Sequence, residues 1–363
     1  MKKFLILLLL LSCQTKQPYR ELQARLDDYF QPQFAAGQPG GAVLIMKDTS
    51  VVFAKGYGVT DLKSGEAITT KTLFNLGSIS KTFVSNGILM LRAQGKLSLE
   101  DSVLKYFPGF KNKSIAQKVK IKHLLTHTSG LPDNRPVSKD SVFYLTAGDA
   151  ENWYPVTQTD TLEFEPGSKY HYSNPAFNAL ALIIEQITGM KWQDFIREKI
   201  LLPSGMKTST ITDGPHPASG VSHAYTMIGH EWREDDYGEE PTFCAAGNGG
   251  VWSSVEELAL YEQALRKGLF LDLKDLDESA TVKTFSNWSD KNSPAIGWSW
   301  FIGQTPDGLK TIGHTGSQGG FAANYVSIPA EKILFVILCN SPRDLAPVTE
   351  RVLALLRDGS YLN

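Results

Sequence analysis

The chain has 363 residues, a formal net charge of −2 at pH 7, and 42% apolar against 20% charged residues. This balance is typical of an ordinary globular protein with room for one large domain or two moderate ones. Because basic residues are not in excess, we expect no nucleic-acid partner. The sequence shows no internal repeat and no apolar run long enough to cross a bilayer.

The first twelve residues predict an export signal. Met1-Lys2-Lys3 supplies a positive start, residues 4–11 are apolar, and Ser12 is followed at once by Cys13. A small residue directly before a cysteine is similar to the bacterial lipoprotein cleavage box, in which the cysteine becomes the lipidated first residue. We therefore expect an exported lipoprotein, periplasmic or at the cell surface, anchored to a membrane through Cys13. Ordinary secretory cleavage that removes this cysteine is the alternative.

The first third of the chain alternates between helix and strand spacing. Residues 19–34 have helical spacing, while residues 41–46 and 51–58 have strand character around a polar turn, which predicts a hairpin. A short helix is expected to begin at residues 97–101 behind a serine cap. A further helix is expected over residues 119–132, up to a glycine and a proline.

The middle of the chain is predicted to be mostly helical and the last third mostly extended. Helical spacing covers residues 179–188, 192–201 and 255–265, the last of these behind Ser254. The elements expected after these are strands at 295–302, 309–314, 321–328 and 333–338, and a closing helix at 345–356. Successive strands this close in sequence indicate an antiparallel sheet.

A hydroxyl and an amine lie three residues apart in Ser78-x-x-Lys81, at the expected start of a helix. Positions i and i+3 share a helix face, so the Lys81 amine can reach the Ser78 oxygen. A serine hydroxyl needs a base in order to attack. A desolvated lysine with a lowered pKa, or a second base held by it, meets that need. Taken alone, the same spacing also fits a serine-capped helix with a surface lysine.

His123 and His127 are four residues apart, a spacing that can place two imidazoles on one metal ion. However, Leu124 replaces the glutamate base that a His-Glu-x-x-His metallopeptidase requires, and no third ligand follows. The glycine-rich stretch 245–250 lacks both the phosphate-binding lysine and the dinucleotide fingerprint. We therefore predict neither a metal nor another cofactor.

Three separated motifs carry a resemblance to a known family. They are Ser78-x-x-Lys81, Tyr172-Ser173-Asn174 and His314-Thr315-Gly316, the last at the end of a predicted strand. Together they resemble the penicillin-recognising serine hydrolases, in the branch that holds class C β-lactamases, D-alanyl-D-alanine carboxypeptidases, D-amino-acid peptidases and related esterases. Other stretches that look like this family are residues 123–131, 165–167, 187–189, 203–206 and 249–250.

The resemblance implies an α/β fold of the α+β type. An antiparallel sheet flanked by helices would pack against a mostly helical lobe, with the active site between the two. Residues 1–12 would be the signal peptide and residues 13–363 a single catalytic domain. Within that domain, the sheet lobe would take residues 19–75 and 245–363, and the helical lobe residues 76–244.

The resemblance also assigns roles to individual residues. Ser78 would be the acylated nucleophile, Lys81 its partner in proton transfer, and Tyr172 the general base or relay. An ordinary tyrosine has a pKa of about 10, so adjacent cations would have to stabilise its phenolate, and Lys81 and His314 are the candidates. Asn174 would hydrogen-bond the substrate amide. Each of these positions also has a plain structural interpretation, such as a buried aromatic or a turn residue.

The third motif would form the substrate-binding side of the site. His314, Thr315 and Gly316 would lie along the substrate, and the main-chain N–H groups of Ser78 and Ser317 would form the oxyanion hole. Class C β-lactamases usually carry a lysine where this chain has His314. A lysine is a permanent cation for a substrate carboxylate, whereas a histidine is charged only part of the time near neutral pH. This departure favours a peptidase or esterase over an efficient β-lactamase.

We therefore expect an exported serine hydrolase that forms an acyl-enzyme on Ser78 and acts on a small-molecule or peptide substrate. Peptide or amide bonds of the D-alanyl-D-alanine type are the first expectation. The alternatives are a carboxylesterase of small acyl esters, a weak β-lactamase, and a non-enzymatic penicillin-binding surface lipoprotein.

Overall fold

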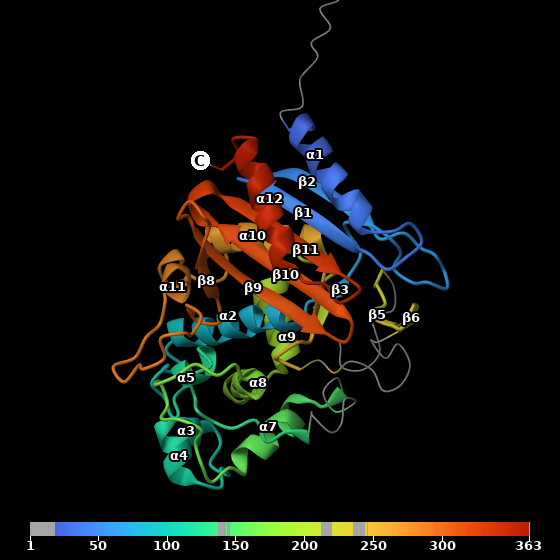
Figure 1. The fold of residues 1–363 in the computed structure, drawn as a ribbon. Helices are drawn as coiled ribbons and strands as arrows, with labels where there is room; N and C mark the ends of the chain where they lie inside the picture. The colour runs from blue at the N-terminus through green and yellow to red at the C-terminus, as the bar shows by residue number, and fades with distance from the viewer. Residues whose placement is uncertain are drawn as a thin grey trace, which may run out of the picture.

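A computed structural model describes residues 19–136, 143, 146–211, 220–234, 244 and 246–362. Cys13 and the predicted export signal lie outside these residues. Within the described part of the chain, an antiparallel sheet is flanked by helices and stands against a mostly helical part (Figure 1). The α/β fold of the α+β type that the sequence implied is the fold observed. Among these residues, no helix combines the length and apolar character needed to cross a bilayer.

In the described part of the chain, six strands form the central sheet in the order β2-β1-β11-β10-β9-β8. The strands are β1 Gly41–Lys47, β2 Ser50–Tyr57, β8 Phe301–Gln304, β9 Lys310–Gln318, β10 Phe321–Ile328 and β11 Ile333–Cys339. All neighbouring pairs are antiparallel, and the strand nearest the N-terminal hairpin is the last one in sequence. The sheet therefore joins the two ends of the chain.

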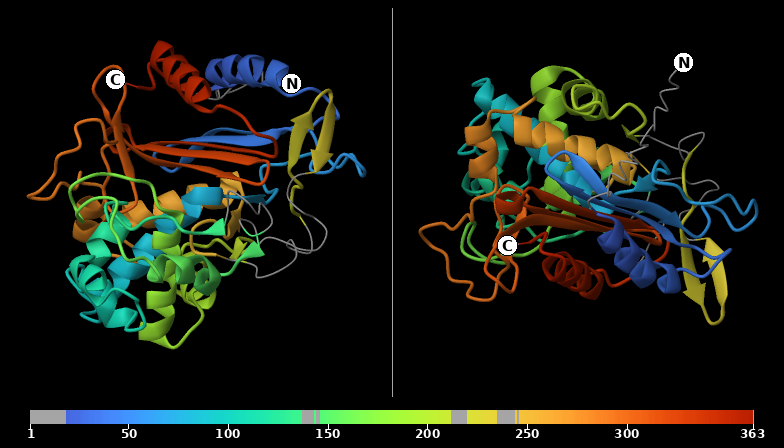
Figure 2. Two further views of the ribbon diagram at one scale, coloured as in Figure 1. Left: turned by 60° about the horizontal axis from the view of Figure 1, so that its bottom comes forward. Right: turned by 90° about the horizontal axis from the view of Figure 1, so that it is seen from above.

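Two helices from opposite ends of the chain cover one face of the sheet (Figures 1 and 2). In α1 (Arg20–Phe30), Leu22, Leu26 and Phe30 are buried, as expected for residues on one side of a 3.6-residue helix. The helix α12 (Ala346–Asp358) lies beside it. Burying each such side chain contributes about 1.5–3 kcal/mol. The sheet residues of this layer include Val43, Ile45, Phe335 and Ile337.

The other face of the sheet packs on α2 (Ser80–Ala93) and α10 (Val255–Lys267). The rings of Phe83 and Tyr261 stack between these two helices, with centroids 4.3 Å apart. α10 begins at the serine cap that the sequence predicted, because Ser254 Oγ accepts a hydrogen bond from the backbone of the third helical residue at 3.2 Å.

The helical part lies below the sheet in Figure 1 and is the region from which α8 contacts α2. Its helices are α3 Val103–Tyr106, α4 Lys113–Lys118, α5 Ile121–Leu125, α7 Asp149–Thr157, α8 Asn174–Thr188, α9 Trp192–Ile196 and the π-helical turn Arg197–Leu201. α2 therefore has the sheet on one side and the helical part on the other.

Smaller elements complete the described structure. They are the strands β3 Phe74–Asn75, β4 Thr210–Ile211, β5 Tyr225–Ile228, β6 Glu231–Glu234 and β7 Val251–Ser253, the helix α11 Leu273–Ser279, and 3-10 turns at Gln31–Gln33, Gly77–Ile79 and Pro329–Glu331. β3 and β4 both pair with β7, which ties the approach to Ser78 to the glycine-rich stretch.

Two helix predictions were wrong. Residues 97–101 form a turn, because Ser98 N donates to Asp101 Oδ2 at 2.9 Å and Glu100 N donates to Ser98 Oγ at 3.2 Å. These side chains close a turn instead of capping a helix. Residues 119–132 are helical only from Ile121 to Leu125, since His127 has a left-handed backbone with φ +57° that ends the helix early.

One strand prediction was also too long. Residues 295–302 contribute strand only from Phe301, because the preceding residues bond to other segments. Trp298 N donates to Ser279 O at 2.8 Å, and Ser299 N donates to Leu125 O at 3.0 Å. These bonds replace the sheet bonds that the apolar pattern predicted.

Candidate active site

Ser78 lies in the 3-10 turn Gly77–Ile79, directly before α2. The turn is fixed from its N-terminal side, because Asn75 Oδ1 accepts a hydrogen bond from Gly77 N at 2.8 Å. Gly77 has φ +50°, and a Cβ atom there would lie 2.6 Å from Ser317 N. Only glycine therefore permits this approach of the turn to β9, which brings the backbones of Ser78 and Ser317 together.

Lys81 lies behind Ser78 and is fully buried. Its Nζ donates to Ser78 Oγ at 3.0 Å and to the carbonyl oxygen of Asn248 at 2.6 Å. Burial holds the pKa of Lys81 well below its usual range, and the nearby charge of Arg135 lowers it further. A lysine with a lowered pKa can lose its proton near neutrality, after which its nitrogen can accept the proton of the serine hydroxyl.

Tyr172 covers the lysine from the side of the helical part. The Lys81 nitrogen lies 5.2 Å from the centre of the Tyr172 ring and 5.7 Å from that of Phe177. Both contacts are within the range of cation–π interactions. The structure thus brings the serine, the lysine and the tyrosine of the first two motifs together.

His127 holds the segment that carries Tyr172. Its carbonyl oxygen accepts from His171 N at 2.9 Å, and its Nδ1 accepts from Ser173 N at 3.0 Å. Its ring stacks on that of Tyr172, with centroids 4.2 Å apart. Burial lowers the pKa of His127 well below its usual value, with Lys81 as the next cause, so the imidazole is neutral.

Asn174 is the first residue of α8, immediately after the capping residue Ser173, whose Oγ accepts from Ala176 N at 3.4 Å. The proline at position 175 suits the first turn of a helix, where its missing N–H is not needed. This local structure places Asn174 at the end of a rigid helix beside the tyrosine.

The third motif lies along an open edge of β9. β10 pairs with β9 on one side as far as Gln318, whereas pairing with β8 on the other side ends at Gly313. Among the described residues, no strand pairs with the remaining edge from His314 onward. Gly316 faces the turn of the nucleophile so closely that a Cβ atom would lie 1.9 Å from Leu76 O.

His314 is buried, with 2% of its surface exposed. Its Nδ1–H donates to the carbonyl oxygen of Thr315 at 2.6 Å, and its ring packs on that of Phe301 at 5.0 Å. Burial, followed by the charge of Lys81, lowers the pKa of His314 to about 3. The expectation that His314 is partly protonated near neutral pH was therefore wrong. At that pH its side chain is neutral and offers no charge to stabilise the phenolate of Tyr172.

One cleft of about 910 Å³ gathers most of the predicted residues. Those that line it are Ser78, Tyr172, Asn174, His314, Thr315, Gly316 and Ser317. Lys81 lies beneath the cleft rather than in its wall. A pocket between a sheet and a helical part is a common place for substrate binding.

The sequence did not single out several groups that shape this cleft. Tyr170 and Phe301 line it, as does the segment 342–346 that leads into α12. The carbonyl oxygen of Asn248 binds the lysine, but a main-chain acceptor has no residue-type signature. The only sequence signal for it was the run of glycines around Asn248, which indicated close backbone packing.

The two histidines weighed as metal ligands have separate structural partners. His123 Nδ1 accepts from Lys120 N at 3.1 Å, whereas His127 Nδ1 accepts from Ser173 N. Within the residues that the structure describes, no group of three histidine, cysteine or acidic side chains is arranged to hold a metal ion.

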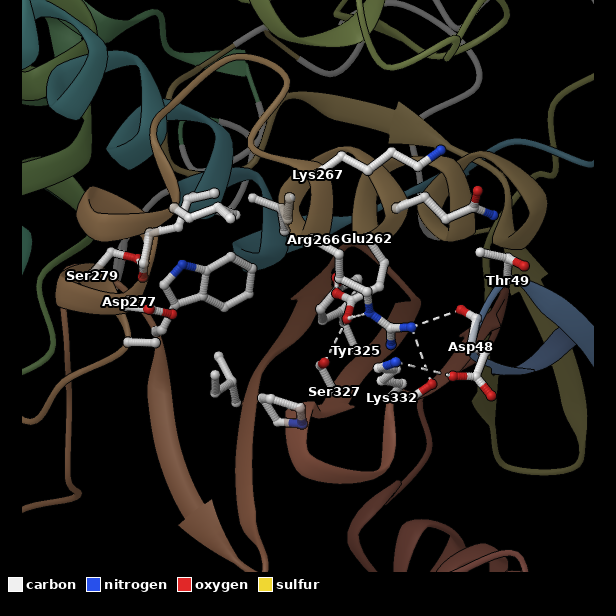
Figure 3. Close-up of a pocket in the computed structure, with 18 residues that line it drawn as sticks. Asp48, Thr49, Glu262, Arg266, Lys267, Asp277, Ser279, Tyr325, Ser327 and Lys332 are labelled. Carbon is white, nitrogen blue, oxygen red and sulfur yellow. Dashed lines mark hydrogen bonds and ion pairs between the residues drawn. The ribbon is translucent and has the colours of Figure 1, made fainter.

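A second cavity of about 530 Å³ lies between α10, α11 and the sheet (Figure 3). Its walls are mainly apolar, and Figure 3 shows Arg266 placed between Glu262 and Asp48. Arg266 Nε donates to Glu262 Oε1 at 2.8 Å, and the Oγ of Ser327 donates to the same oxygen at 2.6 Å. None of the predicted site residues lines this cavity.

A serine oxygen that accepts a hydrogen bond from a buried amine, in a cleft that a tyrosine and an antiparallel strand also line, is the arrangement expected of serine hydrolases that act by nucleophilic catalysis. The family model described as Beta-lactamase matches residues 26–357. The chain belongs to the β-lactamase family, whose members are serine hydrolases, and it is an enzyme of this class.

Similarity to individual proteins covers nearly the whole chain. It is 28% identical to penicillin-binding protein 4* of Bacillus subtilis (strain 168), over 90% of this chain and 72% of that protein. It is 27% identical to a putative D-alanyl-D-alanine carboxypeptidase of Escherichia coli (strain K12), over 90% of this chain and 83% of that protein.

Solved structures show the same fold. The octameric penicillin-binding protein homologue from Pyrococcus abyssi superposes with a TM-score of 0.79 at 25% identity, covering 93% of this chain and 77% of that one. The D-amino acid amidase from Ochrobactrum anthropi SV3 superposes with a TM-score of 0.75 at 21% identity, covering 94% and 99% of the two chains. The β-lactamase/DD-peptidase-like fold that the motifs implied is confirmed.

Proposed function

We propose that the chain is an exported hydrolase that forms an acyl-enzyme on Ser78 and cleaves peptide or amide bonds of the D-alanyl-D-alanine type. The observation that carries this proposal is the contact of 3.0 Å between Lys81 Nζ and Ser78 Oγ. The lysine is buried, its pKa is lowered, and its nitrogen is held from behind by Asn248. Each of these features favours proton transfer from the serine.

The reaction begins when Ser78 Oγ attacks the carbonyl carbon of the scissile amide and gives its proton to the neutral Lys81 amine. The oxyanion that forms accepts hydrogen bonds from the N–H groups of Ser78 and Ser317, which the close approach at Gly77 brings together. The carbon–nitrogen bond then breaks, and the leaving amine takes the proton through Lys81 and Tyr172. Water then attacks the carbonyl carbon of the ester and gives up a proton through Tyr172 and Lys81. The bond to Ser78 Oγ breaks, this oxygen takes the proton, and the acid is released.

The open edge of β9 suits an extended peptide substrate. Its main chain can hydrogen-bond to the strand from His314 to Ser317, in the manner of an added strand. Asn174, at the start of α8, faces the same cleft and is assigned to the substrate amide. Two relatives of this chain are called putative D-alanyl-D-alanine carboxypeptidases, which supports this class of substrate.

The neutral state of His314 weighs against efficient β-lactam hydrolysis. A buried imidazole whose pKa is lowered to about 3 gives no cation at neutral pH for a substrate carboxylate, whether that of a β-lactam or the C-terminal one of a D-alanyl-D-alanine peptide. A short acyl ester needs no such charge. For that reason carboxylesterase activity is the second candidate function.

Three substrates separate these functions: a D-alanyl-D-alanine peptide, a chromogenic cephalosporin and a short-chain aryl ester. We expect the peptide to be turned over and the cephalosporin to react slowly, with all turnover lost in Ser78→Ala. Turnover of the ester alone would replace the peptidase proposal with the esterase. The non-enzymatic alternative is tested by intact mass after treatment with a fluorophosphonate or penicillin. An unmodified wild-type chain would favour a surface binding protein.

We also propose that the protein is exported and anchored to a membrane through a lipid on Cys13. The motif Ser12-Cys13 after an apolar stretch supports this. The measurement is the distribution of wild type and Cys13→Ser between membrane and soluble fractions. We expect only the wild type to be in the membrane fraction. Equal distributions would contradict the anchor.

A further inference from the structure

The glycine-rich turn at residues 246–250 holds the oxygen atom that binds the catalytic lysine. The turn is closed by a hydrogen bond from Gly250 N to Ala246 O at 2.8 Å. Asn248, within it, is buried, and its carbonyl oxygen accepts from Lys81 Nζ at 2.6 Å. The position of this carbonyl oxygen therefore sets where the lysine nitrogen lies relative to the nucleophile.

Asp149 fastens this turn to the helical part. It is the first residue of α7, and its Oδ1 accepts from Gly247 N at 2.8 Å and from Asn178 Nδ2 at 2.7 Å. The same Asn178 Nδ2 lies 3.2 Å from Asn248 Oδ1. One carboxylate oxygen thus reaches position 247 directly and position 248 through the amide on α8.

Close packing leaves the turn one direction in which to move. A Cβ atom on Gly247 would lie 2.7 Å from both Ala181 Cβ and Phe177 O, so the turn is already pressed against α8. A turn released from Asp149 can relax only away from α8. That movement changes the position of the Asn248 carbonyl oxygen.

We propose that Asp149 is a positioning residue for the reaction, because it fixes the Asn248 carbonyl oxygen and, through it, the Lys81 nitrogen. The inference rests on the proposed acylation of Ser78. Asp149 does not line the cleft, so it acts through other residues.

Asp149 holds the turn because its oxygen accepts hydrogen bonds, and a negative charge is not required for this. Burial raises the pKa of Asp149 to about 7, and Glu185 on α8 adds to this effect. The carboxyl group therefore changes its ionisation near neutrality. In either state Oδ1 can accept an N–H, as can the amide oxygen of an asparagine in the same place. We therefore expect asparagine at position 149 to hold the turn as aspartate does, and alanine to release it.

The test compares Asp149→Ala and Asp149→Asn with Glu151→Ala as the matched control. Glu151 lies in the same first turn of α7 and its Oε2 accepts from Gly148 N at 2.8 Å, but it is exposed and bonds to no residue of the turn 246–250. The probe is a fluorophosphonate, and the measurement is the rate of adduct formation by intact mass, resolved into a maximal rate and a half-saturating concentration.

We expect Asp149→Ala to lower the maximal acylation rate about 10- to 100-fold, because a catalytic group displaced by about 1 Å loses up to about a hundredfold. Its half-saturating concentration should change less than about threefold, since the cleft wall is intact. Asp149→Asn and Glu151→Ala should both stay within about threefold of the wild-type rate. A merely structural role for α7 would not lower the maximal acylation rate in Asp149→Ala while leaving it near the wild-type value in Asp149→Asn.

Two results would overturn the role of Asp149: a wild-type rate in Asp149→Ala, or an equal loss in Asp149→Asn. Where Asp149→Ala does not fold, Asn178→Ser breaks the same connection from α8. We expect it to lower the maximal rate about tenfold, and an unchanged rate would overturn the proposal. If the adduct forms on Ser78 at equal rates in wild type and variants, the positioning role of Asp149 is overturned and the proposed function is not. A wild-type chain that forms no Ser78 adduct overturns the proposed function together with this inference.

Discussion

The Lys81 nitrogen lies 3.0 Å from the Ser78 oxygen and, at the same time, 2.6 Å from the carbonyl oxygen of Asn248. The first contact joins two residues of one motif, whereas the second comes from a turn almost 170 positions later in the chain. A lysine side chain has many rotamers, so the distant carbonyl is what fixes it. The proposed chemistry thus depends on a long-range contact as much as on the local spacing.

Replacing the lysine should stop acylation while keeping the fold. Lys81→Arg keeps a charge that cannot be lost at neutral pH, and Lys81→Met keeps the length without a basic nitrogen. We expect both to lower the rate of Ser78 modification by a fluorophosphonate about 10²- to 10⁴-fold, the usual contribution of a general base. Thermal melting should show that Lys81→Met is folded, since it replaces a buried polar amine with an apolar side chain of similar length. A rate within tenfold of wild type would contradict the proposed role of Lys81.

Widening the contact between β9 and the turn of the nucleophile should impair the oxyanion site. In Gly316→Ala, the new Cβ would lie 1.9 Å from Leu76 O, so the strand must move away from the turn of Ser78. We expect kcat to fall about 10²- to 10³-fold, as it does when one oxyanion donor is lost. Gly109→Ala is the control, because a Cβ there meets no atom within 4 Å. Equal activity of the two variants would contradict this function of the glycine.

Replacing His127 should impair catalysis more than replacing His123, a buried histidine nearby. His127→Asn keeps a residue type that tolerates the left-handed backbone and an oxygen that can accept from Ser173 N, but it removes the ring that stacks on Tyr172. We expect the acylation rate to fall about 10- to 100-fold from the displaced tyrosine. His123→Asn is the control, since His123 packs on Phe285 instead. Both variants should melt at a lower temperature than wild type, and only His127→Asn should have a lower acylation rate per folded molecule.

The sequence predicted the parts of the fold that depend on local pattern. The hairpin of β1 and β2, the strands β10 and β11, and the serine-capped helix α10 agree with the observed bounds to within two residues, because each has a strong apolar period and a clear turn or cap. Predictions at residues 97–101 and 119–132 were wrong where side-chain hydrogen bonds or a positive φ angle overrode that period.

The same division holds in the candidate site. Ser78 and Lys81 could be found because they are close in sequence, and Tyr172, Asn174 and His314 because their motifs follow in order. The neutral state of His314 could not be predicted, because it depends on burial in the folded chain, where its ring packs on Phe301 and Lys81 lies nearby. Nor could the link from Asp149 to the turn at 246–250, which joins segments far apart along the chain.

Buried neutral histidines should make the protein less stable in mild acid. The pKa of His314 is lowered to about 3, whereas an unfolded chain has the usual value near 6.5. Between these values the unfolded state binds the proton and the folded state does not, so stability is present above pH 6.5 and is lost progressively as the pH falls towards 3. Each histidine of this kind should cost about 1.4 kcal/mol per pH unit in that window.

Urea unfolding at pH 7.5 and pH 5.5 measures this effect in wild type, His314→Gln and His230→Gln. The wild type should lose about 1 kcal/mol more between the two pH values than His314→Gln, because glutamine does not titrate. His230 is exposed, so its replacement should leave the wild-type difference unchanged. The opposing contribution of Asp149, whose pKa is raised to about 7, is common to all three chains and cancels in the comparison. A pH dependence that is the same with and without His314 would mean that the pKa of this imidazole is the same in the folded and unfolded chain, and the argument against a β-lactamase would lose its basis.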